Sequence, residues 1–172
     1  MFDFKQKIRD IPDFPKKGII FRDISPLLAD GKLFHQAVKE MATVYKGKKI
    51  DKVVGVDARG FILAAAIANE LNIGMVMVRK RGKLPFETES EEYELEYGKE
   101  TLEIQKDAVQ RGEKVLLVDD VLATGGTMFA TTKLVEKLGG KVEGISFLIV
   151  LENLGGTEKL KNYKISFLIK YR

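Results

Sequence analysis

The sequence predicts an α/β fold in which a central, mainly parallel twisted sheet is flanked by helices. Short apolar segments typical of buried strands alternate with segments typical of helices along most of the chain. The apolar segments are nearly continuous, as expected of parallel strands that are covered on both faces. Polar or glycine-containing loops follow three of these strands at their carboxyl ends, where ligands bind in such sheets.

The first half of the chain predicts a helix, a strand and a second helix. Asp30 suits the N-cap of the first helix, and the apolar residues after it share one helical stripe: Leu33, Phe34, Ala37, Val38, Met41, Ala42 and Tyr45. The segment KVVGVD predicts a short buried strand that ends at Asp57. The segment GFILAAAIANELNIG predicts a largely buried helix that closes at Asn72 or Gly74.

The second half of the chain continues the alternation. The segments MVMVRK and KVLLVDD predict two further strands, and TMFATTKLVEKLGG predicts a helix that stops at a double glycine. The last strands are expected in KVEGISFLIVLEN and YKISFLIK. No repeat or low-complexity linker interrupts the 172 residues, so we expect residues 1–172 to form a single domain.

Composition limits the classes of function that the chain can have. The absence of cysteine excludes thiolate nucleophiles, iron–sulfur clusters and cysteine zinc sites. The 29 basic and 25 acidic residues are interspersed, which argues against a nucleic-acid partner. The first residues alternate apolar with charged side chains, and no apolar run approaches the length of a membrane span. We therefore expect a cytoplasmic protein with no membrane partner.

Three loops are expected to converge on one site, namely DARG (57–60), RKRGKLP (79–85) and DDVLATGGT (119–127). The third loop has small and hydroxyl side chains at the start of a helix, where backbone N–H groups and the helix dipole favour an anion. Asp119 and Asp120 would repel a phosphate but suit sugar hydroxyls or Mg²⁺. Paired acids and glycines at a strand-to-helix turn are also ordinary turn chemistry, which remains the alternative interpretation.

The segment VLLVDDVLATGGT resembles the phosphoribosyl-pyrophosphate signature of the type I phosphoribosyltransferases. Five other segments resemble the adenine-using branch of that family and span most of the chain: IPDFPKKGIIFRDISPLL, DARGF, VRKRGKLP, YELEYGKETLEIQKDA and LENLGGTEKL. The resemblance implies the type I fold, with a small N-terminal hood over residues 1–30 and a flexible lid loop over residues 85–98. It also implies a homodimer.

The resemblance further implies a reaction. Adenine and 5-phosphoribosyl 1-pyrophosphate (phosphoribosyl pyrophosphate) would give AMP and pyrophosphate through an oxocarbenium-like transition state. The reaction would depend on Mg²⁺, which substrate oxygens and water would hold in the main, so no dedicated protein ligands of the metal are expected.

Site residues carry over from the family position by position. Asp119 and Asp120 would hold the ribose hydroxyls, and the 5-phosphate would bind a run of five residues: Ala123, Thr124, Gly125, Gly126 and Thr127. Four basic side chains would contact the pyrophosphate: Arg59, Arg79, Lys80 and Lys83. Tyr97 would cover the pyrophosphate. Glu96 would be the acid/base partner of the purine near N7, with Arg59 as the second catalytic residue.

Recognition of the base is expected at the segment GIIFRD. The resemblance implies that backbone groups of Ile20 and Arg22 read the adenine edge, that Phe21 stacks on the ring, and that Leu151 packs from the other side. Core packing is the simpler interpretation of Phe21 and Leu151. The family commonly has an acid directly before this leucine, whereas this chain has Val150, so the register at Leu151 stays open.

Several alternatives remain for the function. A loop lysine or arginine is usually only solvated, and residues 85–98 could be a disordered surface loop. A xanthine- or other-purine phosphoribosyltransferase would share the signature, but GIIFRD and YELEYG favour adenine. A phosphoribosyl-pyrophosphate-sensing regulator would share the fold and bind nucleic acid. Such a regulator would need a clustered basic face or a DNA-binding segment, and we find neither in the sequence.

Overall fold

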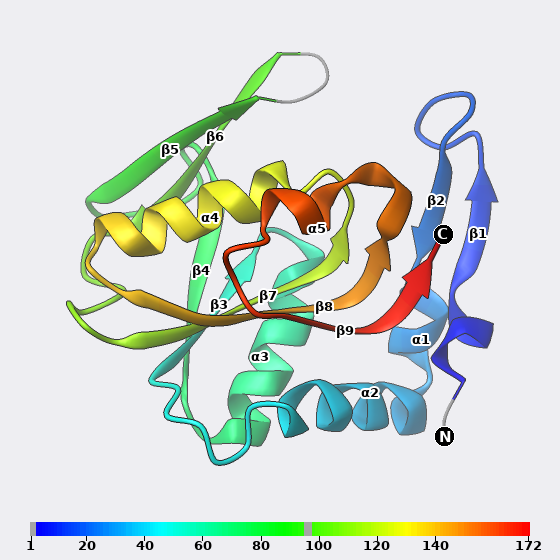
Figure 1. The fold of residues 1–172 in the computed structure, drawn as a ribbon, viewed down its shortest axis with the longest axis horizontal. Helices are drawn as coiled ribbons and strands as arrows, with labels where there is room; N and C mark the ends of the chain where they lie inside the picture. The colour runs from blue at the N-terminus through cyan, green and yellow to red at the C-terminus, as the bar shows by residue number, and fades with distance from the viewer. Residues whose placement is uncertain (1–2, 95–97) are drawn as a thin grey trace.

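A computed structural model describes residues 3–94 and 98–172, and it confirms the predicted α/β architecture (Figure 1). The helices are η1 (Phe4–Lys7), α1 (Ser25–Ala29), α2 (Gly31–Thr43), α3 (Arg59–Leu71), α4 (Gly126–Lys137), η2 (Glu152–Leu154) and α5 (Gly156–Lys159). The strands are β1 (Arg9–Pro12), β2 (Ile20–Asp23), β3 (Lys52–Val56), β4 (Gly74–Lys80), β5 (Thr88–Glu94), β6 (Lys99–Gln105), β7 (Lys114–Leu122), β8 (Lys141–Leu151) and β9 (Ile165–Tyr171).

The main sheet of the described residues has seven strands in the order β5-β6-β4-β3-β7-β8-β9. Strand β3 pairs in parallel with both β4 and β7, and the parallel pairing continues from β7 to β8 and β9. Strands β5 and β6 add an antiparallel hairpin at the β4 edge. The chain winds from β3 first toward β4 and later back to β7, so the switch in direction lies between β3 and β7.

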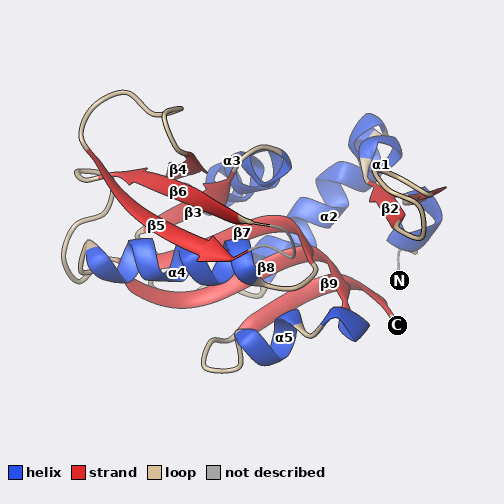
Figure 2. Cartoon of the chain, turned by 90° about the horizontal axis from the view of Figure 1, so that it is seen from above, coloured by secondary structure: helices blue, strands red, loops and turns tan. Residues whose placement is uncertain are grey.

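Helices cover both faces of this sheet (Figure 2). Strand β7 shows how the two faces are filled, because its successive side chains point to opposite sides. Leu116 packs in the core that contains Leu63 of α3, together with residues of α2. Leu117 packs in the core that contains Leu134 of α4. A strand that is buried on both faces explains the unbroken apolar run in the sequence.

The predicted helices begin and end close to the expected residues. Asp30 caps α2, since its Oδ1 accepts a hydrogen bond from the backbone N–H of Leu33 at 3.2 Å. Helix α3 ends at Asn72, which takes the left-handed conformation with φ of 55°. In the described part of the chain, no helix combines the length and the apolar character that a membrane crossing needs.

The expectation of a loop over residues 85–98 is wrong for Thr88–Glu94, which form strand β5, and residues 95–97 lie outside the described residues. The many acids of β5 suggest a solvated loop, but two of them lie on the face of the strand toward α4, where a basic side chain pairs with them. Lys137 of that helix pairs with Glu91 at 2.7 Å and with Glu89 at 3.6 Å. The ion pairs stabilise a strand that is too polar to be expected from its sequence alone. A lid function for this hairpin stays a prediction.

The two-stranded sheet of β1 and β2 forms the N-terminal part predicted as a hood. This hairpin stands beside the C-terminus at the right of the view, while the β5–β6 hairpin runs along α4 and rises above it at the upper left (Figure 1). Strand β2 pairs with β1 along one edge, from Ile20 opposite Pro12 to Asp23 opposite Arg9. Its other edge has no strand partner in the part of the chain that the structure describes.

Candidate active site

A cavity of about 820 Å³ opens at the carboxyl ends of β3 and β7, at the switch in strand direction. Ten predicted site residues line it: Ile20, Phe21, Arg22, Arg59, Asp119, Asp120, Ala123, Thr124, Thr127 and Leu151. Nine further residues line it, to which the sequence assigned no individual role: Gly18, Ile19, Asp57, Ala58, Val121, Asn153, Leu154, Tyr171 and Arg172. The structure therefore joins the predicted ribose, phosphate and base residues in one site.

The remaining predicted residues lie outside this lining. Gly125 and Gly126 line a smaller cavity of about 90 Å³ on the same loop. Three basic residues are not among the lining residues of the large cavity: Arg79, Lys80 and Lys83. Glu96 and Tyr97 lie outside the described residues.

The loop after β7 has a backbone that only glycine fits well. Gly125 is the N-cap of α4 with φ of 79°, a left-handed conformation that side chains disfavour. A Cβ at Gly125 would lie 3.0 Å from the carbonyl oxygen of Gly156. A Cβ at Gly156 would lie 2.3 Å from the carbonyl oxygen of Ala123. The segment LENLGGTEKL thus contributes a glycine that supports the loop, a role that its sequence did not indicate.

Asp119 and Asp120 lie within β7, just before this loop. Burial, together with the neighbouring charge of Asp120, raises the pKa of Asp119 well above its usual range. Burial also raises the pKa of Asp120, and the nearby Arg59 guanidinium opposes that rise. Arg59 Nε lies 2.8 Å from Asp120 Oδ2. Asp120 is 5% exposed and Asp119 is half-buried, and adjacent carboxylates withdrawn from water are costly without partners, so this pair suits a ligand that donates hydrogen bonds or brings a cation.

The segment DARG, which follows β3, contacts both acids: Gly60 lies against Asp119, and Arg59 pairs with Asp120. A Cβ at Gly60 would lie 2.6 Å from Asp119 Oδ1, so the first turn of α3 approaches this carboxylate closely. Asp57 lines the cavity and accepts a hydrogen bond from Arg79 Nε at 2.8 Å. Arg79 Nη1 also donates to the backbone carbonyl of Lys83 at 3.2 Å. The loop after β4 is therefore connected to the cavity through Asp57.

Two residues with different predicted roles contact each other in the cavity: Arg59, expected to bind pyrophosphate, and Phe21, expected to stack on the purine. The Arg59 guanidinium carbon lies 4.8 Å from the centroid of the Phe21 ring, so Arg59 covers the aromatic side chain expected to stack on a purine. The Arg22 side chain pairs with Asp10 and lies 3.9 Å from the Tyr171 ring centroid. Because its side chain is engaged in this way, Arg22 offers a ligand mainly its backbone.

The structure shows where Leu151 and Val150 lie at the end of β8. Leu151 lines the cavity and pairs with Tyr171 of β9. Val150 is 1% exposed and lies in the core shared with α4. The substitution of an acid by valine therefore places an apolar side chain in the core and leaves Leu151 at the site.

No cluster of three or more His, Cys, Asp or Glu residues that could hold a metal ion occurs among the described residues. Asp119 and Asp120 are the two adjacent carboxylates of the cavity. A Mg²⁺ ion usually keeps several waters and takes one or two carboxylates together with substrate phosphates. The donors present fit an ion held in that way.

Comparison with known proteins identifies the family. Residues 28–170 match the model of the phosphoribosyl transferase domain. The chain is 57% identical to an adenine phosphoribosyltransferase of Geobacter metallireducens over 99% of this chain and 100% of the relative. The crystal structure of adenine phosphoribosyltransferase from Thermoanaerobacter pseudethanolicus superposes with a TM-score of 0.95 at 54% identity, over 98% of each chain.

A solved complex adds information on ligands. Adenine phosphoribosyltransferase from Saccharomyces cerevisiae, crystallised with adenine and an imino-altritol bisphosphate, superposes with a TM-score of 0.89 at 38% identity over 95% of each chain. The fold, the converging loops and these similarities agree over nearly the whole length. The chain belongs to the adenine phosphoribosyltransferases, purine-salvage enzymes of the type I phosphoribosyltransferase family.

Proposed function

We propose that the cavity holds phosphoribosyl pyrophosphate with its ribose over Asp119 and Asp120 and its 5-phosphate on residues 123–127. The observation that carries this proposal is a buried carboxylate, ion-paired but without a hydrogen bond to its Oδ2, beside a loop that can bind an anion. Asp120 Oδ2 is buried and, among the described residues, makes no hydrogen bond despite the nearby Arg59. Ribose hydroxyls would donate to these carboxylates, and backbone N–H groups at the start of α4 would bind the phosphate.

The acids would also serve the reaction itself. The bond between the anomeric carbon and pyrophosphate breaks while a new bond forms to a ring nitrogen of adenine, and the ribose gains oxocarbenium character in between. The carboxylates of Asp119 and Asp120 would stabilise this positive charge most strongly in the transition state. Glu96 would exchange a proton with the purine near N7. A carboxyl group enclosed away from water has a raised pKa, which suits proton donation.

Cations would stabilise the departing pyrophosphate. Arg59 would leave the face of Phe21 and contact pyrophosphate when substrates bind, while Arg79, Lys80 and Lys83 would approach from the loop after β4. Tyr97 would cover the group. Guanidinium forks suit such bidentate contacts. Mg²⁺, when bound, would neutralise charge on the leaving group, and the carboxylates of Asp119 and Asp120 would help to hold it through water.

Adenine would enter between the hood and the end of β8. Phe21 would stack on the ring once Arg59 has moved, Leu151 would pack on its other face, and backbone groups of Ile20 and Arg22 would read its edge. Adenine and an imino-altritol bisphosphate occur together in the yeast relative, which supports a site that takes a base and a phosphorylated sugar analogue at the same time. Backbone groups discriminate a 6-amino from a 6-oxo purine because the wrong base leaves a buried group unpaired.

We also propose a homodimer. Large apolar side chains are solvent-exposed in the single chain, with Ile62 and Met77 each 43% exposed and Phe86 70% exposed. An interface between two subunits would bury such residues. Light scattering of the purified protein should give twice the mass of one chain, and a monomeric mass would contradict this proposal.

The function is tested by incubating the purified protein with Mg²⁺, phosphoribosyl pyrophosphate and one purine base at a time, and measuring pyrophosphate release. Adenine should support turnover, whereas guanine, hypoxanthine and xanthine should not. Chelation of Mg²⁺ with EDTA should abolish the reaction, and added Mg²⁺ should restore it. Turnover with a 6-oxo purine but not with adenine would disprove the proposed specificity.

The role of Glu96 is tested by Glu96→Gln, with Glu94→Gln as the matched control. Loss of the proton-transferring carboxyl should lower kcat by about 100-fold, within the usual range for general acid–base catalysis. The exposed side chain of Glu94 has no assigned role, so its variant should keep wild-type kinetics. Equal kcat values for Glu96→Gln and the wild type would reject the assignment.

A further inference from the structure

Tyr93 lies where the β5–β6 hairpin meets residues 123–127, which the proposed function assigns to the 5-phosphate and which we call the phosphate loop. Its half-buried ring packs on the first turn of α4, because a Cβ at Gly126 would lie 3.3 Å from Tyr93 Cδ2. The Tyr93 hydroxyl accepts a hydrogen bond from Thr127 Oγ1 at 3.2 Å. It donates one to Glu100 Oε2 at 2.9 Å. One side chain thus contacts both the phosphate loop and strand β6.

The chain of contacts continues to the end of β4. The other oxygen of the Glu100 carboxylate, Oε1, pairs with the Lys80 ammonium group. A chain of polar contacts therefore runs from Thr127, through Tyr93 and Glu100, to Lys80. Lys80 is one of the residues predicted to bind the pyrophosphate. Cooperative chains of this kind orient their members better than separate pairs do.

The direction of each hydrogen bond in this chain is defined by protonation. Burial, with smaller contributions from Glu100, raises the pKa of Tyr93 to about 12, so its hydroxyl stays a donor at neutral pH. Partial burial opposes ionisation of Glu100, but hydrogen bonds from Lys80 and Tyr93 hold its pKa below the usual range. The ionised Glu100 accepts from both neighbours, and the hydroxyl of Tyr93 is left to accept from Thr127.

We propose that Tyr93 is a positioning residue that prepares both phosphate-binding ends of the site for one substrate. Its hydroxyl holds the Thr127 side chain at the 5-phosphate seat and, through Glu100, holds the Lys80 ammonium for the pyrophosphate. This inference rests on the proposed function, which assigns the two phosphate groups to Thr127 and Lys80. Groups that are already oriented lose less freedom when the substrate binds.

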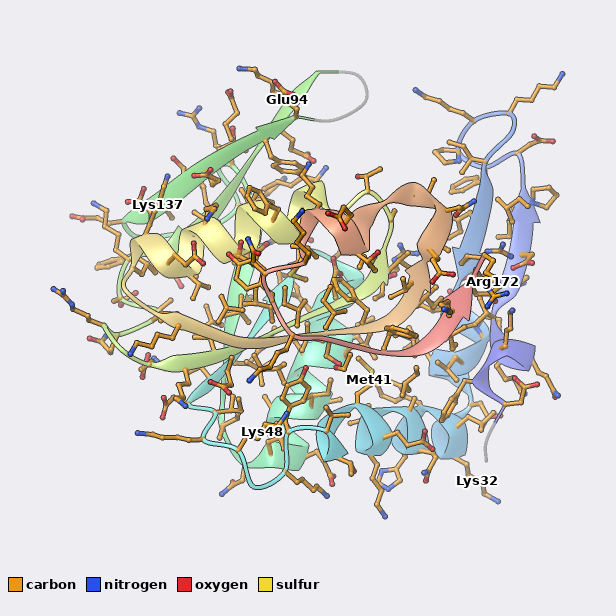
Figure 3. All side chains as sticks on the ribbon, in the orientation of Figure 1. Lys32, Met41, Lys48, Glu94, Lys137 and Arg172 are labelled. Carbon is orange, nitrogen blue, oxygen red and sulfur yellow. The ribbon has the colours of Figure 1, made fainter. Side chains whose placement is uncertain are left out.

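The backbone of Tyr93 is held independently of its hydroxyl. Lys137 Nζ, near the other end of β5, donates to the carbonyl oxygen of Ser90 at 2.8 Å and pairs with Glu91 at 2.7 Å. Lys137 and Glu94 mark the two ends of this packing between β5 and α4 (Figure 3). Tyr93→Phe should therefore keep the ring on Gly126 and remove only the two hydrogen bonds.

The experiment measures, by calorimetry in the presence of Mg²⁺, the Kd values of three ligands: AMP, pyrophosphate and phosphoribosyl pyrophosphate. For Tyr93→Phe we expect the Kd values of AMP and of pyrophosphate each to rise about fivefold, the usual effect of one lost hydrogen bond. The Kd of phosphoribosyl pyrophosphate should rise by the product, about 25-fold. The KM of adenine should be unchanged, which separates positioning from general damage.

A matched control is available on the same helix. The Tyr163 hydroxyl donates to Glu136 Oε1 of α4 at 2.6 Å, but neither residue lines the cavity. Tyr163→Phe therefore removes a tyrosine–glutamate hydrogen bond of the same kind and should leave all three Kd values unchanged. Glu100→Gln should weaken pyrophosphate binding alone about fivefold, since Thr127 keeps its contact with Tyr93.

The possible outcomes are distinct. If Tyr93→Phe binds phosphoribosyl pyrophosphate within twofold of the wild type, the inference is overturned while the proposed function stands. If the wild type does not convert adenine at all, the proposed function is disproved before any variant of Tyr93 is compared. Should Tyr93→Phe not fold, Glu100→Gln decides, because an unchanged Kd for pyrophosphate in that variant would overturn the inference as well.

Discussion

The two ends of the cavity are built in different ways. The end proposed to bind phosphate, here called the phosphate end, is one continuous segment, residues 115–127, in which a strand, two acids and a glycine turn follow each other directly. The end proposed to bind the base, here called the base end, combines residues 18–22 of the N-terminal hairpin with Leu151, Asn153 and Tyr171 from the last part of the chain. The phosphate end is thus contiguous in sequence, and the base end exists only after the chain has folded.

This difference explains why the two ends leave unequal marks in the sequence. A left-handed turn and a close backbone approach restrict a position to glycine, so the phosphate loop has a distinctive pattern. The base end needs an aromatic ring and an aliphatic side chain, which are also the commonest core residues. Substitutions should therefore act most strongly at the phosphate end, where backbone geometry is involved, and less at the base end.

The largest effect is expected for Gly125→Ala, with Gly112→Ala as its control. The new Cβ would lie 3.0 Å from the carbonyl oxygen of Gly156 and would displace the loop. A displacement of about 1 Å can cost 100-fold in rate, so we expect kcat/KM for phosphoribosyl pyrophosphate to fall about 100-fold. Gly112 has a similar φ of 86° but open space around it.

Gly112→Ala should consequently cost about 1–2 kcal/mol of stability through backbone strain and leave the kinetics unchanged. Steady-state assays and denaturant unfolding of both variants measure the two effects. An active Gly125→Ala enzyme, or an equal loss of activity in the control, would show that the approach of Gly156 is not what shapes the loop.

A smaller effect on binding, with a gain in stability, is expected for Asp119→Asn. Loss of a charged hydrogen-bond acceptor should raise the Kd of phosphoribosyl pyrophosphate about tenfold. Because burial raises the pKa of Asp119 in the folded state, the wild type loses stability as pH rises above the ordinary value of 3.8. The asparagine variant escapes this loss.

The melting temperature of Asp119→Asn should therefore exceed that of the wild type, and by a larger margin at neutral pH than at a pH close to the ordinary pKa of an aspartate. The amide oxygen keeps the hydrogen bond that Asp119 Oδ1 accepts from the backbone N–H of Asp120. Differential scanning calorimetry at both pH values tests this expectation. A variant that is less stable than the wild type at neutral pH would contradict the raised pKa.

The smallest effect is expected at the base end, for Phe21→Ala. Loss of an aromatic stacking partner should raise the KM of adenine about five- to tenfold and leave the KM of phosphoribosyl pyrophosphate unchanged. Phe14 packs edge-on against Phe21, with ring centroids 5.2 Å apart, but does not line the cavity. Phe14→Ala should change the KM of adenine by twofold at most, and an equal effect of both variants would indicate a merely structural role for Phe21.

Local patterns in the sequence determined much of this protein. Helix α2, its cap at Asp30, the end of α3 at Asn72 and the doubly buried β7 all follow from side-chain periodicity and backbone preferences over a few residues. The passage from a strand through a glycine turn into a helix at residues 119–127 was predicted for the same reason. Convergence of the loops after β3 and β7 on one cavity also followed, because parallel strands have their carboxyl ends together. The third predicted loop, residues 79–85, does not line that cavity.

Only the tertiary structure decided the contacts between distant segments. Strand β5 was missed because its acids Glu89 and Glu91 are compensated by Lys137, which lies far along the chain, in α4. The support of the phosphate loop by Gly156, the position of Arg59 over Phe21, and the link from Tyr93 to Thr127 likewise join separate parts of the sequence. Such contacts depend on distances in space, and a local pattern carries no information about which distant partner will neutralise a charge or fill a gap.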